Sequence, residues 1–316
     1  MSETVRKVPE LSLLSYVNGS ESDRKEFVDK LFIGLKDYGF IVLTDHTVDQ
    51  KKVDHAYELL KKFYAQPVEV KMNYCGDNGG QRGYTPFKTE HAKDNENPDL
   101  KEFWHVGREL SATSQYKGVY PENVWPDSEV PGFKDAFMSL YSAMDETANH
   151  LLEAIGMALD LPKDFFAEMV SDGNSILRAI HYPPTVGEDT KSSIRAAAHE
   201  DINLITMLVG ATDSGLELLD RDGTWLPVQS APGQIVVDTG DMMSRITNDV
   251  LPATTHRVVN PKDDNSERYS MPYFVHPHSN ALLSCIASCI GEGAKYPDIT
   301  AGDFLIQRLK EIGLYK

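Results

Sequence analysis

The sequence has few cysteines, no long apolar run and fewer basic than acidic residues. Its three cysteines are odd in number, which excludes a fully paired disulfide framework and fits a reducing compartment. No stretch approaches the ~20 apolar residues of a membrane-spanning helix, and the first residues lack the apolar core of a signal peptide. We therefore expect a cytoplasmic protein that has no membrane partner.

The charge balance also excludes some functions. Thirty-one Lys and Arg against 48 Asp and Glu give a formal net charge of −17, which repels nucleic-acid phosphates. The sequence contains no phosphate-binding loop ending in Lys-Ser/Thr and no serine nucleophile elbow. We therefore expect no nucleic-acid partner, and neither a P-loop NTPase nor a serine hydrolase.

No repeat and no Gly/Ser-rich or Pro-rich linker interrupts the 316 residues, so we expect a single unit. From about 176 to 275, strand-like runs alternate with turn signals, a pattern typical of an antiparallel double-sheet jelly roll. Asp238 and Asp241 flank Gly240 at a strand end, where we expect a turn. Residues 73–130 show little periodicity, and a long irregular stretch in a compact protein is more often functional than idle.

The predicted fold class is mainly β with flanking helices, around a double-stranded β-helix (jelly-roll) core. The single unit of residues 1–316 would comprise a helical and covering segment at about 1–130, the core at about 175–280 and a closing helix at 300–312. The elements with the clearest patterns are helices at 22–38, 49–65, 132–161 and 301–312 and a short strand at 40–43.

The most informative motif is His199-Glu200-Asp201, followed 55 positions later by His256. Alternate residues of a strand point the same way, so His199 and Asp201 can aim at one metal while Glu200 points away. Two imidazoles and one carboxylate can occupy one face of an octahedral iron(II), leaving open positions for substrate and oxygen. The motif therefore predicts an iron site of His199, Asp201 and His256, which are also the candidate catalytic residues.

A second motif follows on the next predicted strand. Arg268 and Ser270 alternate onto one face, where a guanidinium fork and a hydroxyl can hold one carboxylate. The gap of 12 positions from His256 to Arg268 contains a turn-forming stretch that can bulge without moving the strands. An anion clamp beside an iron triad indicates a site built to hold an acidic co-substrate.

With these motifs in place, the sequence resembles the isopenicillin N synthase-like family of non-haem iron oxygenases, most of which use 2-oxoglutarate. The likeness covers nearly the whole chain. The matching stretches are residues 8–11, 39–46, 177–183, 198–208, 240–241, 247–248, 256–258 and 268–272.

The resemblance implies that the protein is an enzyme that uses Fe(II), 2-oxoglutarate and O2 to hydroxylate or otherwise oxidise a small organic substrate, releasing succinate and CO2. It adds Tyr182, before Pro183, to Arg268 and Ser270 as residues that bind the co-substrate. Phe274 is expected to face the cavity on the iron side. Arg82, in the substrate-covering segment, is a candidate partner for a charged group of the substrate.

Two alternatives stay open at this stage. Isopenicillin N synthase resembles this sequence in having Glu between its metal ligands, where many 2-oxoglutarate users have Thr, and it consumes no 2-oxoglutarate. Arg268 and Ser270 would then clamp a carboxylate of the primary substrate. The other alternative is a non-catalytic sensor that binds a metabolite in the same pocket. No motif in the sequence encodes the substrate or the number of subunits.

Overall fold

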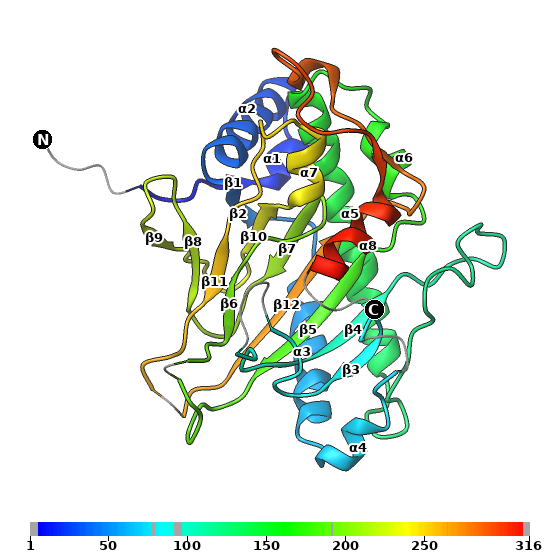
Figure 1. Cartoon of the computed structure of the whole chain (residues 1–316), viewed down its shortest axis with the longest axis vertical. Coiled ribbons are helices and arrows are strands. Elements are labelled where there is room, and N and C mark those ends of the chain that lie inside the picture. The colour runs from blue at the N-terminus through cyan, green and yellow to red at the C-terminus, as the bar shows by residue number, and fades with distance from the viewer. Residues whose placement is uncertain (1–5, 77–79, 92–96, 191, 264, 312–316) are drawn as a thin grey trace, which may run out of the picture.

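A computed structural model describes residues 6–76, 80–91, 97–190, 192–263 and 265–311 of the chain. Strands form two main sheets, and most of the helices pack on the outer face of the larger one (Figure 1). Residue 312, the last residue of the expected closing helix, lies outside the described ranges. Residues 1–5 also lie outside them. Among the described helices, none is long and apolar enough to cross a bilayer.

The larger sheet has eight strands and the smaller has four, and the two form the walls of the jelly roll. In spatial order the larger sheet contains β1 (Glu10–Ser12), β2 (Phe40–Asp45), β10 (Ile235–Thr239), β7 (Ile205–Val209), β12 (Arg268–Val275), β5 (Ile176–Tyr182), β4 (Glu102–Gly107) and β3 (Gly83–Thr85). The smaller sheet contains β6 (Ala196–His199), β11 (His256–Val258), β8 (Leu216–Leu219) and β9 (Trp225–Pro227), and β13 (Leu282–Leu283) pairs separately with β14 (Ile299–Thr300).

Side chains alternate across the larger sheet, so one face lines the interior of the jelly roll and the other meets the helices. In β12, Arg268, Ser270 and Phe274 face the interior cavity. Their neighbours Tyr269 and Met271 belong to the hydrophobic core on the helix side. The same alternation in β5, β7 and β10 delivers polar side chains to the interior, while the outer face is mostly apolar, with His181 and Thr239 as buried polar exceptions.

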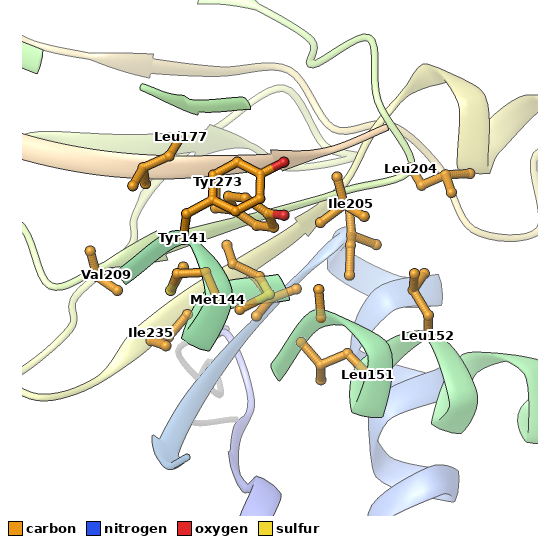
Figure 2. Close-up of a cluster of buried hydrophobic side chains, with 14 of the residues drawn as sticks. Tyr141, Met144, Leu151, Leu152, Leu177, Leu204, Ile205, Val209, Ile235 and Tyr273 are labelled. Atoms are coloured by element: carbon orange, nitrogen blue, oxygen red, sulfur yellow. The ribbon is translucent and has the colours of Figure 1, made fainter. Parts of the chain in front are cut away.

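Helices cover the outer face of the larger sheet and enclose the main hydrophobic core. The longest, α5 (Phe133–Ala158), packs against α2 (Glu21–Tyr38), α3 (Gln50–Tyr64) and the sheet. Figure 2 shows side chains of α5, among them Met144 and Leu151, meeting Leu177, Ile205 and Tyr273 of the strands. The remaining helices are α1 (Leu13–Asn18), α4 (Val68–Met72), α6 (Phe165–Val170), α7 (Asp241–Ile246), the 3-10 turn η1 (Ala287–Cys289) and α8 (Ala301–Glu311).

Local chemistry explains where α2 begins and ends. The Ser20 hydroxyl accepts from the backbone N–H of Asp23, and the Asp23 carboxylate accepts from the backbone N–H of Ser20, which together make a capping box. Gly39 ends the helix with φ +67, a left-handed conformation that favours glycine. A Cβ at Gly39 would also lie 2.2 Å from the Thr254 hydroxyl, so both the backbone and the space require glycine. The expected helix end at Gly39 is confirmed.

The region 73–130 holds more regular structure than expected. It contributes β3 and β4 to the larger sheet, and every residue of β4 is buried. A strand buried on both faces has no polar–apolar alternation, because both sets of side chains are covered. The sequence of β4 therefore carries no strand pattern.

Candidate metal centre and substrate cavity

The predicted triad residues come together between the two sheets. One ligand atom from each of His199, Asp201 and His256 lies within 4.8 Å of the others. His199 ends β6, and His256, at the start of β11, is its direct partner across the antiparallel pair. β6 ends at His199, so Asp201 lies two residues beyond the strand, and the chain bends only after it, at 202–204. His199 and Asp201 converge as predicted, and Glu200 between them is exposed.

Hydrogen bonds fix which nitrogen of each histidine ring is available to a metal. His199 Nδ1 lies 2.7 Å from the Ala197 carbonyl, and His256 Nδ1 lies 3.1 Å from the Thr254 carbonyl. Because a carbonyl only accepts, each Nδ1 carries a proton, so Nε2 is the nitrogen of each ring that can bind a metal. The two Nε2 atoms lie 3.7 and 3.9 Å from Asp201 Oδ1. Two imidazole nitrogens and one carboxylate oxygen therefore face a common point.

The electrostatics of the triad suit a divalent cation. Burial and then the charge of His256 lower the pKa of His199 to about 4, so its ring is neutral, as a metal ligand must be. Burial lowers the pKa of His256, but the carboxylates of Asp201 and Asp238 outweigh it and leave the pKa raised. The Thr206 hydroxyl donates to Asp201 and holds that carboxylate in place. This donor set of two nitrogens and one oxygen fits iron(II).

Asp238 belongs to this centre, although its sequence context predicted only a turn. That prediction was wrong, because Asp238 is a buried residue of β10 that pairs with Phe40 and Thr206. Its Oδ2 lies 3.8 Å from His256 Nδ1. Burial, together with the Asp201 carboxylate, raises the pKa of Asp238 to about 7. The sequence signal was the spacing. Asp238 comes two residues after Val236, so both side chains point to the inward face of the strand.

The predicted anion clamp lies beside the triad and lines the same small cavity. Arg268 is paired with Tyr182 across β12 and β5, and its guanidinium carbon lies 4.9 Å from the Tyr182 ring centroid. Its Nη1 donates to the Ser270 hydroxyl at 3.1 Å, and its Nε donates to the Asp213 carbonyl at 3.2 Å. Arg268 is buried, so an anion bound there would be largely shielded from water.

A larger cavity of about 780 Å³ opens on the other side of the metal centre. Phe274 lines both this cavity and the small one, as expected for a residue on the iron side. Its walls come from residues 75–76 and 80–91, from β4 and β5 and from α8. Leu305 and Leu309 of α8 supply an apolar wall, so the closing helix is part of the cavity.

Arg82 lies behind the wall of this cavity. Its side chain is fully buried, with Nη1 donating to the Gln81 carbonyl at 2.7 Å and Nη2 to Asn174 Oδ1 at 2.8 Å. Gln81 and Asn174 both line the cavity, whereas Arg82 is not among its lining residues. The position favours support of two lining residues over direct contact, and the substrate role of Arg82 stays a prediction.

Four charged residues of the wall were not predicted. Lys101, the residue before β4, and Arg178 of β5 line the cavity, and Glu90 and Asp99 lie against them. Arg178 Nε also donates to His105 Nε2 at 2.6 Å. Asp99 and Lys101 are neighbours in the sequence, but Glu90 and Arg178 come from other segments, 88 positions apart, so no local pattern links the four residues.

The comparisons with known proteins agree with this geometry. Residues 8–128 match the family described as non-haem dioxygenase in morphine synthesis, N-terminal, and residues 173–277 match the 2OG-Fe(II) oxygenase superfamily. The 2-oxoglutarate-Fe(II) type oxidoreductase hxnY of Emericella nidulans is 32% identical over 84% of this chain and 79% of its own.

Solved structures show the same likeness over the whole chain. A 2OG-Fe(II) oxygenase family protein from Caulobacter crescentus is 45% identical, with a TM-score of 0.87 over 96% of this chain and 98% of that one. A full-length Neurospora crassa protein, solved with alpha-KG (2-oxoglutarate) and thymine, is 25% identical with a TM-score of 0.86 over 98% of both chains.

These relatives confirm the predicted fold class and favour 2-oxoglutarate use over the oxidase and sensor alternatives. The chain therefore belongs to the 2OG-Fe(II) oxygenase superfamily, as an enzyme that uses iron(II), 2-oxoglutarate and oxygen to oxidise a small organic substrate.

Proposed function

We propose that His199, Asp201 and His256 hold the iron(II) of this oxygenase and that Arg268, Ser270 and Tyr182 bind the far carboxylate of 2-oxoglutarate. The observation that carries the proposal is the shared cavity, in which the converging triad and the buried arginine line one space. The protein would act as one unit, with the jelly roll carrying the site and the irregular segment and α8 covering it.

Each residue of the clamp has a distinct task in this proposal. The buried Arg268 guanidinium supplies the counter-charge for the carboxylate, and Ser270 adds a hydroxyl donor. The Tyr182 ring lies against the guanidinium and limits its rotation. Bound iron and 2-oxoglutarate supply the oxygen activation, with release of succinate and CO2. The protein positions the substrate and excludes water.

The substrate would lie in the larger cavity, with the bond to be oxidised facing the triad. Phe274 supports this arrangement, because its side chain borders both the substrate cavity and the co-substrate space. Hydroxylation is the default outcome, and desaturation or ring closure can occur on the same scaffold. The thymine bound to the Neurospora crassa protein shows that this fold can hold a small uncharged ring.

A cytoplasmic location is part of the same proposal. All three cysteines are free thiols, which suits a reducing compartment. The formal charge of −17 argues against a nucleic-acid or anionic membrane partner. Immunofluorescence of the tagged protein, expressed in its own host, would test the location.

Anaerobic iron(II) titration of Asp201→Ala tests the metal assignment. Losing one of three protein ligands should weaken iron binding by more than about a hundredfold, since loss of an outer-shell partner alone commonly costs ten- to a hundredfold. Asp54→Ala, an exposed aspartate on α3, is the matched control and should bind iron like the wild type. Wild-type iron affinity in Asp201→Ala would contradict the assignment.

A further inference from the structure

A compact group of ion pairs lies in the wall of the substrate cavity. Lys101 Nζ lies 2.7 Å from Glu90 Oε2 and 2.8 Å from Asp99 Oδ2. Arg178 donates from Nη1 and Nη2 to the two Glu90 oxygens at 3.1 and 3.2 Å. These four side chains, which we call the wall cluster, contain two positive and two negative charges. All four line the cavity.

The third lysine or arginine of the lining is also paired. Arg308 of α8 lies 3.0 Å from Asp241 Oδ2 through its Nε and 2.6 Å from Glu311 Oε2 through its Nη1. Each lysine and arginine that borders the cavity in the described part of the chain therefore already has a carboxylate partner. A substrate anion would have to compete with a carboxylate of the protein for its counter-charge.

Glu90 is held in the wall by its backbone as well as by its side chain. Its carbonyl accepts from the Asp99 N–H at 2.9 Å, and the nearby Lys88 N–H donates to the Lys101 carbonyl at 3.3 Å. Its carboxylate lies between both cations, with 14% of the side chain exposed. Displacing Glu90 would therefore break backbone bonds and leave buried charges without partners, which is costly.

We propose that Glu90 is a specificity-determining residue that, together with Asp99, neutralises Lys101 and Arg178 and restricts this wall of the cavity to an uncharged substrate group. The inference rests on the proposed function, since it assigns the larger cavity to the substrate. A substrate carboxylate would add a buried negative charge without a free counter-charge. A substrate cation placed at the same wall would find the Glu90 and Asp99 carboxylates already paired with Lys101 and Arg178.

The wall cluster suits an uncharged group that accepts hydrogen bonds. The bonds of Arg178 to His105 and Glu90 use only part of its N–H groups. Its guanidinium carbon lies 4.3 Å from the Phe103 ring centroid and 5.3 Å from that of Phe274, so rings flank the donor. Arg178 also borders the co-substrate space, close to where oxidation occurs. A carbonyl or hydroxyl oxygen on a small apolar body matches these surroundings.

Three probes of similar shape and different charge test this proposal: benzamide, benzoate and benzylamine. The protein is loaded with zinc(II) and 2-oxoglutarate, because zinc keeps the ligands but has no redox chemistry. Ligand-observed NMR then gives the affinity of each probe. In the wild type, benzamide should bind at least as tightly as the other two. Tighter binding of benzoate or of benzylamine would overturn the proposal.

Glu90→Gln tests the residue itself. It removes one negative charge while keeping the shape, so the wall gains a net positive charge. Benzoate should then bind about tenfold or more tightly than in the wild type, because it gains a charge-assisted bond. Glu90→Asp keeps the charge and should still disfavour benzoate. Glu188→Gln, which removes a salt bridge to Lys88 outside the cavity lining, is the matched control.

The outcome is read as the ratio of benzoate to benzamide affinity within each protein. An unchanged ratio in Glu90→Gln would overturn the specificity role. If neither probe binds the wild type, failure of benzoate to bind Glu90→Gln would overturn it as well. Anaerobic iron titration and 2-oxoglutarate binding are measured on the same samples and report the proposed function separately. If Glu90→Gln does not fold, the comparison of the three probes on the wild type still decides whether the cavity prefers uncharged molecules.

Discussion

Arg268 differs from Arg178 and Arg308, the two arginines of the cavity lining, in lacking a carboxylate at hydrogen-bond distance among its described contacts. Arg178 and Arg308 pair with acidic side chains, whereas Arg268 donates to a hydroxyl and a backbone carbonyl. A buried guanidinium whose partners are neutral is poised to take a ligand carboxylate. This difference separates the co-substrate space from the substrate cavity.

Replacing Arg268 with Ala should weaken 2-oxoglutarate binding about ten- to a hundredfold, because a charge-assisted buried bond contributes roughly 1.5–3 kcal/mol. Iron affinity should change much less, since Arg268 does not belong to the triad. Lys at this position should restore only part of the affinity, because it keeps the charge but loses the fork. Calorimetric titration of zinc-loaded protein measures the effect, and wild-type 2-oxoglutarate affinity in Arg268→Ala would contradict the clamp.

His105 gives the folded protein a pH dependence of known sign. Burial and the adjacent Arg178 charge lower its pKa well below the ordinary 6.5. The unfolded chain therefore binds a proton below about pH 6.5 that the folded chain does not, so this contribution to stability is present above that pH and lost as the pH falls. Urea unfolding of the apoprotein at about pH 8 and about pH 5 should show a smaller loss in His105→Gln than in the wild type. An equal loss would show that His105 titrates normally.

At the scale of single residues, the sequence predicted the side chains that share one short motif or one strand face. His199 with Asp201 and Arg268 with Ser270 are such pairs, and both lie together in the structure. Glu90 and Arg178 are 88 positions apart. Nothing in the local pattern links two residues that only the strand order brings together, so the wall cluster could not be predicted.

Among the elements, β12 contributes both to the site and to the hydrophobic core. Its inward residues form the clamp and reach the cavity, while its outward residues pack in the main core. Alternation made this strand and its roles predictable, and the four longest helices were predicted by their 3.6-residue pattern, whereas the short helices were not. Among the strands that were not predicted, β3 and β4 are fully buried, and β3 is only three residues long. Burial on both faces removes the pattern on which such predictions depend.

Helix α8 is attached to the rest of the molecule by few buried groups. Ala301 and Phe304 are its buried residues, and the Arg245 guanidinium lies 5.4 Å from the Phe304 ring centroid. The ion pair of Arg308 with Asp241 adds a polar contact to α7. A helix held by so few buried side chains is expected to unfold locally before the core unfolds.

Phe304→Ala should therefore loosen α8 without unfolding the jelly roll. Removing a buried phenylalanine costs about 3–5 kcal/mol in a core, and here the loss should appear mainly as local opening. Amide exchange in residues 301–311 should become about tenfold faster or more, while exchange in β7 and β12 stays slow. Leu282→Ala, on an exposed side chain, is the control. Faster exchange throughout the core would show that α8 is integral to global stability.

Over the whole molecule, the net charge of the chain contrasts with the paired charges of the cavity lining. The chain has a formal charge of −17, yet the described lining of the substrate cavity pairs each of its cations with a carboxylate. Composition gives the net charge of the chain. It could not predict the ion pairs of the cavity lining, because net charge does not say which residues are in contact. The fold class and the metal centre followed from motifs, whereas the chemistry of the cavity required the strand order.

The whole molecule should also respond to its two site ligands in steps. A ligand that binds only the folded state stabilises it by RT ln(1 + [L]/Kd), or about 2.7 kcal/mol at a hundredfold excess over Kd. For a chain of 316 residues this corresponds to a rise in Tm of about 4 °C. Zinc(II) should give one such rise in the Tm, and 2-oxoglutarate should give a second one, with no turnover because zinc has no redox chemistry.

Arg268→Ala should keep the rise caused by zinc(II) and lose most of the rise caused by 2-oxoglutarate. Asp201→Ala should lose both, because binding of 2-oxoglutarate is expected to need the bound metal. A full second step in Arg268→Ala would show that 2-oxoglutarate does not rely on the clamp.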